Sequence, residues 1–246
     1  MKKIIYTIFF LLSGTFAIAQ KSKAKDPTLV DNIAVQLDGQ LHEWEGKLTS
    51  IDTDTSWSYA ASNDEEYIYL AVKIRQQSLV QEAARNGIKI SVNPKAKKKG
   101  GAMLFFPSAD AESKRALSNA DNVAEMNIPK ELIKRSRGYL LKNFAHIVDG
   151  QLSFENTYGV AAKAAIDDQN HLIYESRIPI AAIGINDLDQ PVAIGIEIIT
   201  RFSQLQTALS SHARQVGNRY GRQPARVKSP YKMKTEIWIV DILNKN

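Results

Sequence analysis

The sequence predicts an all-β protein, an antiparallel β-sandwich with short inserted helices. Apolar residues alternate with polar ones over several short segments, which is typical of strands that bury one face. Turn-forming residues separate these segments, and helical periodicity is confined to two short stretches. Because strands and helices do not alternate regularly along the chain, the sequence gives no indication of a parallel sheet with crossover helices.

The clearest strand signal lies in residues 67–74, where every second residue is a large aliphatic one. The residues that share this face are Ile68, Leu70, Val72 and Ile74. Since successive side chains of a strand point to opposite faces, this segment is predicted to be half buried. The same alternation predicts further strands at 88–92, 158–166, 172–176, 192–198 and 237–243.

The segments that connect these strands contain one turn signal and two short stretches with helix signals. The run Asp-Asp-Gln-Asn at 167–170 is a turn signal, so the strands at 158–166 and 172–176 are predicted to form a hairpin. A short helix is predicted at 78–85, closed by the Asn-Gly pair that follows it. A second is predicted at 129–135, where a proline stands in the first turn.

The N-terminus has the three parts of a secretory signal peptide, which we predict at 1–19. Lys2 and Lys3 precede an apolar run, and Ala17-Ile18-Ala19 supplies a cleavage site. The apolar run is well short of the roughly 20 residues that a spanning helix needs. We therefore expect a secreted or periplasmic protein with no transmembrane segment after cleavage.

The mature chain is predicted to be one domain. Residues 20–30 are polar and lysine-rich and indicate a flexible lead-in, and 31–246 are expected to form a single β-sandwich domain. A polar insertion near 107–138 and a long basic loop near 203–232 interrupt the strand pattern. Loops of that length are usually functional or disordered.

Composition narrows the partners and the chemistry. The chain has no cysteine, so its stability must come from a hydrophobic core and not from disulfides. Its net charge of +6 is uneven, because basic residues gather in 21–25, 95–99 and 201–234. Nucleic acid is not expected as a target of an exported protein, whereas an acidic glycan or an anionic envelope surface fits the charge.

Catalytic patterns are sparse, and we expect no enzyme. No G-x-S-x-G motif occurs, and the S-x-x-K at 22–25 lies in the lead-in, where its geometry would not be held. His42 and Glu43 begin like a zinc-protease motif, but Gly46 stands where the second histidine should be. Each remaining histidine is expected to be an ordinary surface or core residue.

One segment resembles the start of a calcium loop. Asp52, Asp54 and Ser56 follow a D-x-D-x-S pattern whose oxygens can converge on a hard cation. Trp57 replaces the glycine that an EF-hand requires, and Asn63 replaces its bidentate glutamate, so an EF-hand is excluded. A looser calcium site at Asp52 and Asp54 stays open, and no other cofactor is expected from these patterns.

The stretch from Val35 to Trp44 contains a D-G-x-x-x-E-W motif that resembles the opening of the family 9 carbohydrate-binding modules and their DOMON-like relatives. Tyr174 to Pro179 resembles the Y-x-x-x-I-P segment of the same family. Other stretches that fit this plan, in order, are 58–72, 87–92, 192–198 and 235–243. The resemblance spans most of the mature chain and implies a sandwich of immunoglobulin-like or jelly-roll-like form.

The resemblance also implies a binding mode, a sugar clamped between two aromatic side chains, often with structural calcium nearby. The first aromatic would precede the strand at Gly87, but 81–86 contain none. The second would lie before the last strand, where Tyr231 stands with its basic neighbours Arg226 and Lys228. These three are the candidate ligand-binding residues. The chain's tryptophans, Trp44, Trp57 and Trp238, are expected in the core and not as sugar platforms.

Three functions follow as hypotheses. The first is a secreted, noncatalytic module that binds carbohydrate or a cell-envelope glycan. The second is an envelope interaction protein that docks through its basic loop at 203–232. The third is a DOMON-like haem-binding domain, for which the available side chains are those of Met103, Met126, His146 and His171.

Overall fold

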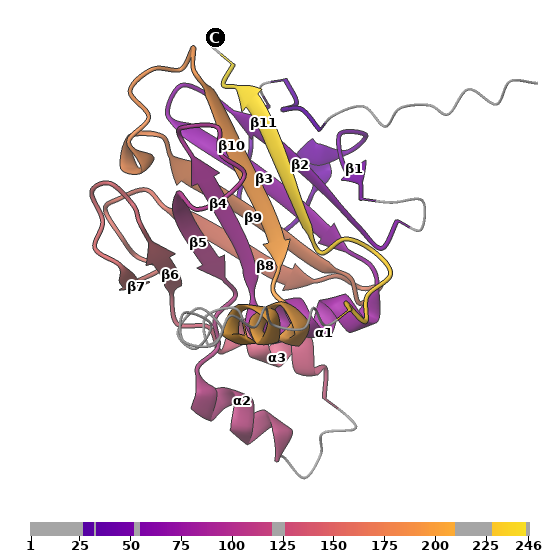
Figure 1. Ribbon diagram of the computed structural model, residues 1–246. Coiled ribbons are helices and arrows are strands. Elements are labelled where there is room, and N and C mark those ends of the chain that lie inside the picture. Colours follow the sequence, from indigo (N-terminus) through magenta and orange to yellow (C-terminus); the bar gives the residue numbers. More distant parts are fainter. Residues whose placement is uncertain (1–26, 32, 52–54, 120–125, 210–227, 245–246) are drawn as a thin grey trace, which may run out of the picture.

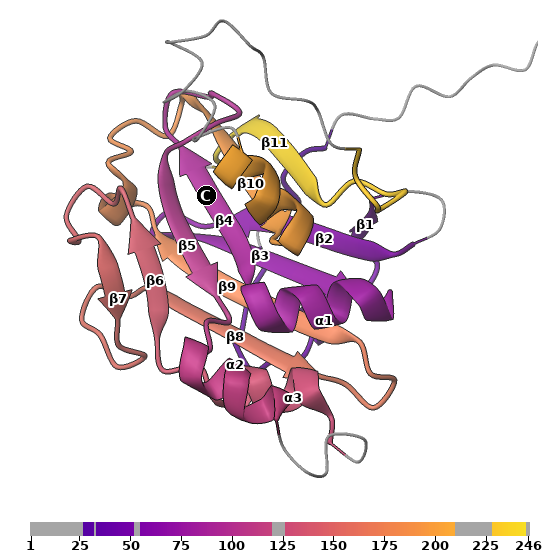
Figure 2. The same cartoon turned by 60° about the horizontal axis from the view of Figure 1, so that its bottom comes forward.

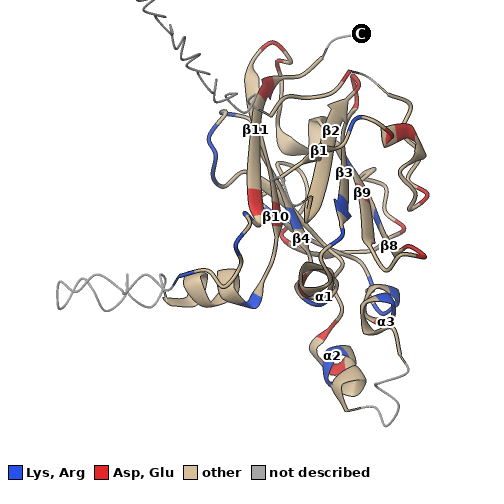
Figure 3. Cartoon of the chain, turned by 90° about the vertical axis from the view of Figure 1, so that its right-hand side faces the viewer, with Lys and Arg blue, Asp and Glu red and all other residues tan. Residues whose placement is uncertain are grey.

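Two antiparallel sheets packed face to face make up the protein (Figure 1). The structure is a computed structural model that describes residues 27–31, 33–51, 55–119, 126–209 and 228–244. Figure 3 shows the two sheets edge-on, as two layers. The predicted all-β sandwich with inserted helices is therefore confirmed. The predicted signal peptide and most of the predicted lead-in lie outside the described residues.

The first sheet has five strands, and it contains the predicted strand at 67–74 and the predicted hairpin. Its order is β1 (Thr49–Ser50), β2 (Trp57–Asn63), β3 (Tyr67–Ile74), β9 (Leu172–Pro179) and β8 (Ala161–Ile166). β8 and β9 pair antiparallel, with Ile166 opposite Leu172. The turn signal between them thus joins neighbouring strands, as predicted.

The second sheet has six strands. Its order is β11 (Glu236–Ile242), β10 (Pro191–Ile198), β4 (Ile88–Asn93), β5 (Ala102–Phe106), β6 (Tyr139–Lys142) and β7 (Gly150–Leu152). β4, β10 and β11 match the predicted strands at 88–92, 192–198 and 237–243. Neither β5 to β7 nor β1 was predicted from the alternation, because each has five residues or fewer and offers few periods to read.

The main core lies between the sheets and is built from the inward faces that the period-two pattern marks. On β3 all four predicted inward residues, Ile68, Leu70, Val72 and Ile74, have 0% exposure. On β10 the corresponding residues are Val192, Ile194, Ile196 and Ile198. Each aliphatic side chain buried in this way stabilises the fold by about 1.5–3 kcal/mol relative to exposure.

A second, smaller core covers the outer face of the five-stranded sheet. The N-terminal segment crosses this face, and its short 3-10 helix η1 (His42–Trp44) places Trp44 against Ala60 and Ala71. Trp44 and Trp57 both have 0% exposure, as expected for core residues. Trp238 is different: it is only half buried, on the outward face of the six-stranded sheet, so its predicted place in the core is wrong.

Short helices gather at one end of the sandwich (Figure 2). They are α1 (Gln77–Asn86), α2 (Ala111–Ser118) and α3 (Ile128–Lys134). A separate 3-10 turn, η3 (Ala181–Ile183), follows β9. α1 and α3 confirm the helices predicted at 78–85 and 129–135. α2 lies in the predicted polar insertion and was not predicted, although Asp110 caps it by accepting a hydrogen bond from the Ser113 backbone N–H.

The segment at 203–232, which was predicted to be a long basic loop, begins as a helix. Residues 201–209 are helical, and 228–235 lead into β11, while 210–227 lie outside the described residues. Thr200 and Ser203 begin this helix by exchanging side-chain and backbone hydrogen bonds of 3.0 Å. Among the helices that the structure describes, none is long and apolar enough to cross a membrane.

Candidate functional site

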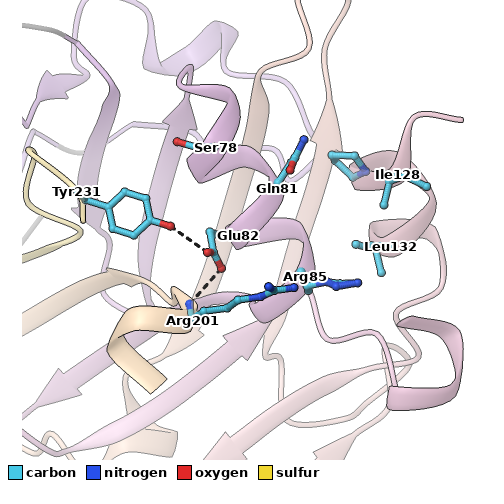
Figure 4. Close-up of a pocket in the computed structure, with 9 residues that line it drawn as sticks. Ser78, Gln81, Glu82, Arg85, Ile128, Leu132, Arg201 and Tyr231 are labelled. Atoms are coloured by element: carbon cyan, nitrogen blue, oxygen red, sulfur yellow. Dashed lines mark hydrogen bonds between the residues drawn. The ribbon is translucent and has the colours of Figure 1, made fainter. Parts of the chain in front are cut away.

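Tyr231 lies at the helical end of the sandwich, where the segment before β11 passes α1. Its hydroxyl donates a hydrogen bond of 2.9 Å to Oε1 of Glu82, which stands on α1 (Figure 4). The other oxygen of Glu82 accepts hydrogen bonds from the Arg201 backbone N–H, at 3.1 Å, and from Asn86 Nδ2, at 2.6 Å. Glu82 therefore ties three separate segments together at this point.

The tyrosine hydroxyl is held in its neutral, donating form. Burial, together with the hydrogen bond to the Glu82 carboxylate and the negative charge of that group, raises the pKa of Tyr231 to about 12. A phenol that donates to a carboxylate loses this bond on ionisation, so the pair is stable at neutral pH. The aromatic ring of Tyr231 is thereby fixed in place above α1.

Two cavities flank Tyr231, and together they form a groove across α1 that we call the Tyr231 groove. The first has a volume of about 410 Å³, and α3 supplies its apolar wall through Ile128 and Leu132. The second has a volume of about 720 Å³ and lies toward the loop before β2. Tyr231 and Ser78 line both cavities.

The groove is rich in positive charge. Arg85 and Arg201 line the first cavity, and Figure 4 shows their side chains along the same edge of it. Arg75 and Lys232 line the second. None of these four cations takes part in an ion pair among the described residues. Glu82 is the one carboxylate in the described lining of either cavity, and its oxygens are already engaged.

Tyr231 is the one aromatic side chain among the described residues that line the groove. The segment before β4, where the family resemblance would place a second aromatic, forms α1 and contributes Gln81, Glu82 and Arg85 instead. A ligand in this groove would therefore meet an aromatic face on one side and hydrogen-bonding, cationic groups on the other.

The structure describes only some of the remaining residues that the sequence suggested as ligand-binding or calcium-binding. Lys228 is exposed just before Tyr231, whereas Arg226 lies outside the described residues. Asp52 and Asp54 also lie outside them, so the calcium hypothesis is not addressed by the structure. Within the described part of the chain, no three His, Asp or Glu side chains gather in a way that could hold a metal ion.

The four side chains considered for haem come from four segments of the chain, of which those of Met126 and His171 are neighbours through the hydrogen bond between Asn127 and Asn170. Met103 lies on the outward face of β5, and Met126 lines a cavity of about 310 Å³ beside α3. His171 Nδ1 lies 3.2 Å from Asp167 Oδ2, and His146 is exposed after β6. None of the four cavities around Tyr231, Tyr139 and Met126 is lined by both a histidine and a methionine of the described part of the chain.

The sequence suggested Tyr231 as a candidate but did not suggest the residues that surround it. Glu82 is 149 positions from Tyr231, and Arg75, Arg85 and Arg201 belong to three different segments. A sequence-level signal existed for α1 as a helix but none for what packs beside it. Only the sheet topology, which brings α1 and the segment before β11 to one end of the sandwich, assembles the groove.

Comparison of the chain with protein-family profiles, with characterised proteins and with solved structures finds no match. The class that fold and site define is therefore an antiparallel β-sandwich with a basic, single-aromatic groove at its helical end.

Proposed function

We propose that this protein is a noncatalytic binding module for an acidic glycan, with the Tyr231 groove as its binding site. The observation that carries the proposal is the pairing of one fixed aromatic ring with four cations that have no carboxylate partner among the described residues. The signal sequence predicted at 1–19 places such a protein in the periplasm or outside the cell, where envelope and extracellular glycans occur.

The chemistry of the groove suits a sugar acid. A pyranose presents C–H groups on one face, and these pack on the negative face of an aromatic ring such as that of Tyr231. Arginine binds carboxylates and sulfates through a planar fork of N–H donors, so Arg85 and Arg201 are suited to an anionic substituent. Ser78 and Gln81 supply donors and acceptors for hydroxyl groups.

Calorimetric titration with polygalacturonate, and with a neutral glucan as comparison, tests the proposal. We expect the acidic polymer to bind and the neutral one to bind more weakly. Replacing both Arg85 and Arg201 by Gln is expected to weaken binding of the acidic polymer by about tenfold or more, since two charged hydrogen bonds are lost. Arg115→Gln, an exposed arginine of α2 outside the groove, is the matched control and should bind normally.

Two results would contradict this proposal. One is the absence of binding across a broad panel of acidic and neutral glycans. The other is equal affinity of the Arg85→Gln/Arg201→Gln variant and the Arg115→Gln control, which would show that the two groove arginines do not contribute to binding.

A second candidate function is docking of the protein onto an envelope partner through the basic segment at 203–232. It is favoured by two leucines four positions apart in the helical residues 201–209, Leu205 and Leu209, which are 50% and 38% exposed. Removal of 203–227 is expected to abolish co-purification with such a partner. Retention of the partner by that deletion, or by a Leu205→Ser/Leu209→Ser variant, would exclude this function.

A further inference from the structure

The outward face of the six-stranded sheet carries an aromatic residue in an unusual position. Ile239 of β11 points into the core, where its exposure is 0%, so the alternation of the strand turns Trp238 outward. Trp238 belongs to β11, the edge strand of the sheet, and lies opposite Gly195 of the neighbouring strand β10. The residue beneath the indole is thus the one amino acid that has no side chain.

The indole of Trp238 lies face-on against Gly195. A Cβ atom added at residue 195 would be 2.9 Å from each of Cζ2, Cη2 and Cζ3 of the ring. Three consecutive ring atoms can be equidistant from one point only if the point lies over the ring and not beside its edge. One face of the indole therefore covers the backbone of β10, and the opposite face is directed away from the sheet.

The ring is fixed in this orientation. Its Nε1–H donates a hydrogen bond of 2.8 Å to Oε1 of Glu236, two residues earlier on the same strand. An aromatic side chain that is already immobilised loses little conformational entropy when a ligand stacks on it. The register places Ser91 of β4 next to Gly195, where it is buried with 2% exposure, and Lys89 forms an ion pair with Glu197 one step further along.

One end of this face is strongly basic. The loop between β4 and β5 contains four exposed lysines, Lys95, Lys97, Lys98 and Lys99. Asn93, which points to the same face as Ser91, accepts a hydrogen bond from the Lys95 backbone N–H and donates one to the Lys99 carbonyl. These bonds, of 2.9 and 2.7 Å, anchor the loop at the outward face, and Figure 3 shows it on that side of the sheet.

None of the four lysines takes part in an ion pair among the described residues. Asn93 lies about 7 Å from Ser91 along β4, so the loop begins within reach of an extended ligand that rests on Trp238. A ligand that matches this face has rings with a face of C–H groups, which pack on the indole, and negative charges, which pair with the lysines. Acidic polysaccharides combine both properties.

We propose that the outward face of the six-stranded sheet is a second carbohydrate-binding surface, on which an acidic polysaccharide stacks on Trp238 and is neutralised by Lys95 to Lys99. This surface is separate from the Tyr231 groove, which lies at the helical end of the sandwich. It therefore does not depend on ligand binding in that groove.

Tryptophan fluorescence reports on this surface directly. The chain has three tryptophans, and Trp44 and Trp57 have 0% exposure, so acrylamide in solution has collisional access to Trp238 far more than to the other two. Saturating polygalacturonate is expected to lower the acrylamide quenching constant of the wild-type protein at least twofold. Trp238→Ala should abolish the quenchable component and weaken polymer binding about tenfold.

Two further variants separate stacking from charge and from folding. Gly195→Val is expected to displace the indole and to weaken binding as Trp238→Ala does, provided that its unfolding midpoint shows a folded protein. A Lys97→Gln/Lys98→Gln/Lys99→Gln variant, which keeps Trp238 and the Asn93 anchor, should bind more weakly at low salt, while the wild-type protein approaches the same affinity at high salt.

The Tyr231→Ala variant distinguishes the two sites. It should keep the polymer-induced protection of Trp238 even if all binding in the Tyr231 groove is lost. The proposal is overturned if polygalacturonate does not bind, if it binds without changing the quenching of Trp238, or if Trp238→Ala binds as the wild type does. Concentration-dependent protection of Trp238 without polymer, with a dimer in sedimentation, would instead assign this face to self-association.

Discussion

The indole N–H of Trp44 donates a hydrogen bond of 3.2 Å to Oε1 of Glu175, and both residues have 0% exposure. The second oxygen of Glu175 accepts a hydrogen bond of 2.9 Å from the backbone N–H of Gly39. A carboxylate on β9 thus fastens the D-G-x-x-x-E-W turn to the outer face of the five-stranded sheet. The D-G-x-x-x-E-W motif at the start of the domain therefore has a structural role.

The Glu175 carboxyl makes the stability of the protein depend on pH. Burial raises its pKa to about 7 from an ordinary value of 4.5, although the two N–H donors act in the opposite direction. Between these values the folded protein binds a proton that the unfolded chain has released. The stabilising contribution is therefore complete below about pH 4.5 and is lost as the pH rises through 7, on the order of 3 kcal/mol in all.

Replacing Glu175 by Gln removes this dependence. We expect a flatter profile of unfolding free energy between pH 4.5 and 7.5, measured by urea denaturation at constant ionic strength. Below pH 4.5 the variant should be about 1–3 kcal/mol less stable than the wild type, because the amide oxygen can accept from only one of the two N–H donors. This difference should shrink as the pH rises toward 7.5, because only the wild type loses stability there. Glu45→Gln, on the exposed side of the same turn, is the control. Parallel profiles for the wild type and Glu175→Gln would refute the assignment.

The sequence predicted the sheets better than it predicted contacts across them. Alternation identified β3, β4 and β10, since each buries one face completely and has six or more residues. The alternation also places Trp238 correctly, on the face of the strand opposite to Ile237 and Ile239. We nevertheless predicted a core residue there, because the side chain is large and apolar. By contrast, Trp44 and Glu175 are 131 positions apart, and no local pattern relates them.

The two tryptophans, Trp44 and Trp238, are expected to differ sharply when truncated. Trp44→Ala removes a fully buried side chain from the smaller core and should lower the unfolding free energy by about 3–5 kcal/mol. Trp238→Ala acts on the outward face and should cost about 1 kcal/mol. Urea denaturation of the two variants under the same conditions measures both. Equal losses would mean that Trp238 is as important to folding as a core residue.

The ring and the hydroxyl of Tyr231 have separable roles. Tyr231→Phe keeps the aromatic face but leaves Glu82 Oε1 without its donor, so the unfolding free energy should fall by about 1 kcal/mol while glycan affinity changes little. Tyr231→Ala also removes the ring that packs against the main core, so it should lose more stability than Tyr231→Phe and, in addition, its affinity in the groove. Equal affinity losses in the two variants would show that the hydroxyl, and not ring stacking, is what the ligand recognises.

The loop that carries Lys95 to Lys99 depends on Gly101 for its closure. Gly101 has a φ of +87°, and a Cβ atom there would lie 2.2 Å from the Val92 carbonyl oxygen. Gly100 has a φ of +61°, but a Cβ atom there would meet nothing within 4 Å. Gly100→Ala should therefore cost only the backbone strain of about 1 kcal/mol. Gly101→Ala should cost at least about 2 kcal/mol more, because the backbone of β4 must move. Thermal and urea unfolding of the pair would measure this difference, and similar midpoints would show that the loop adapts without disturbing β4.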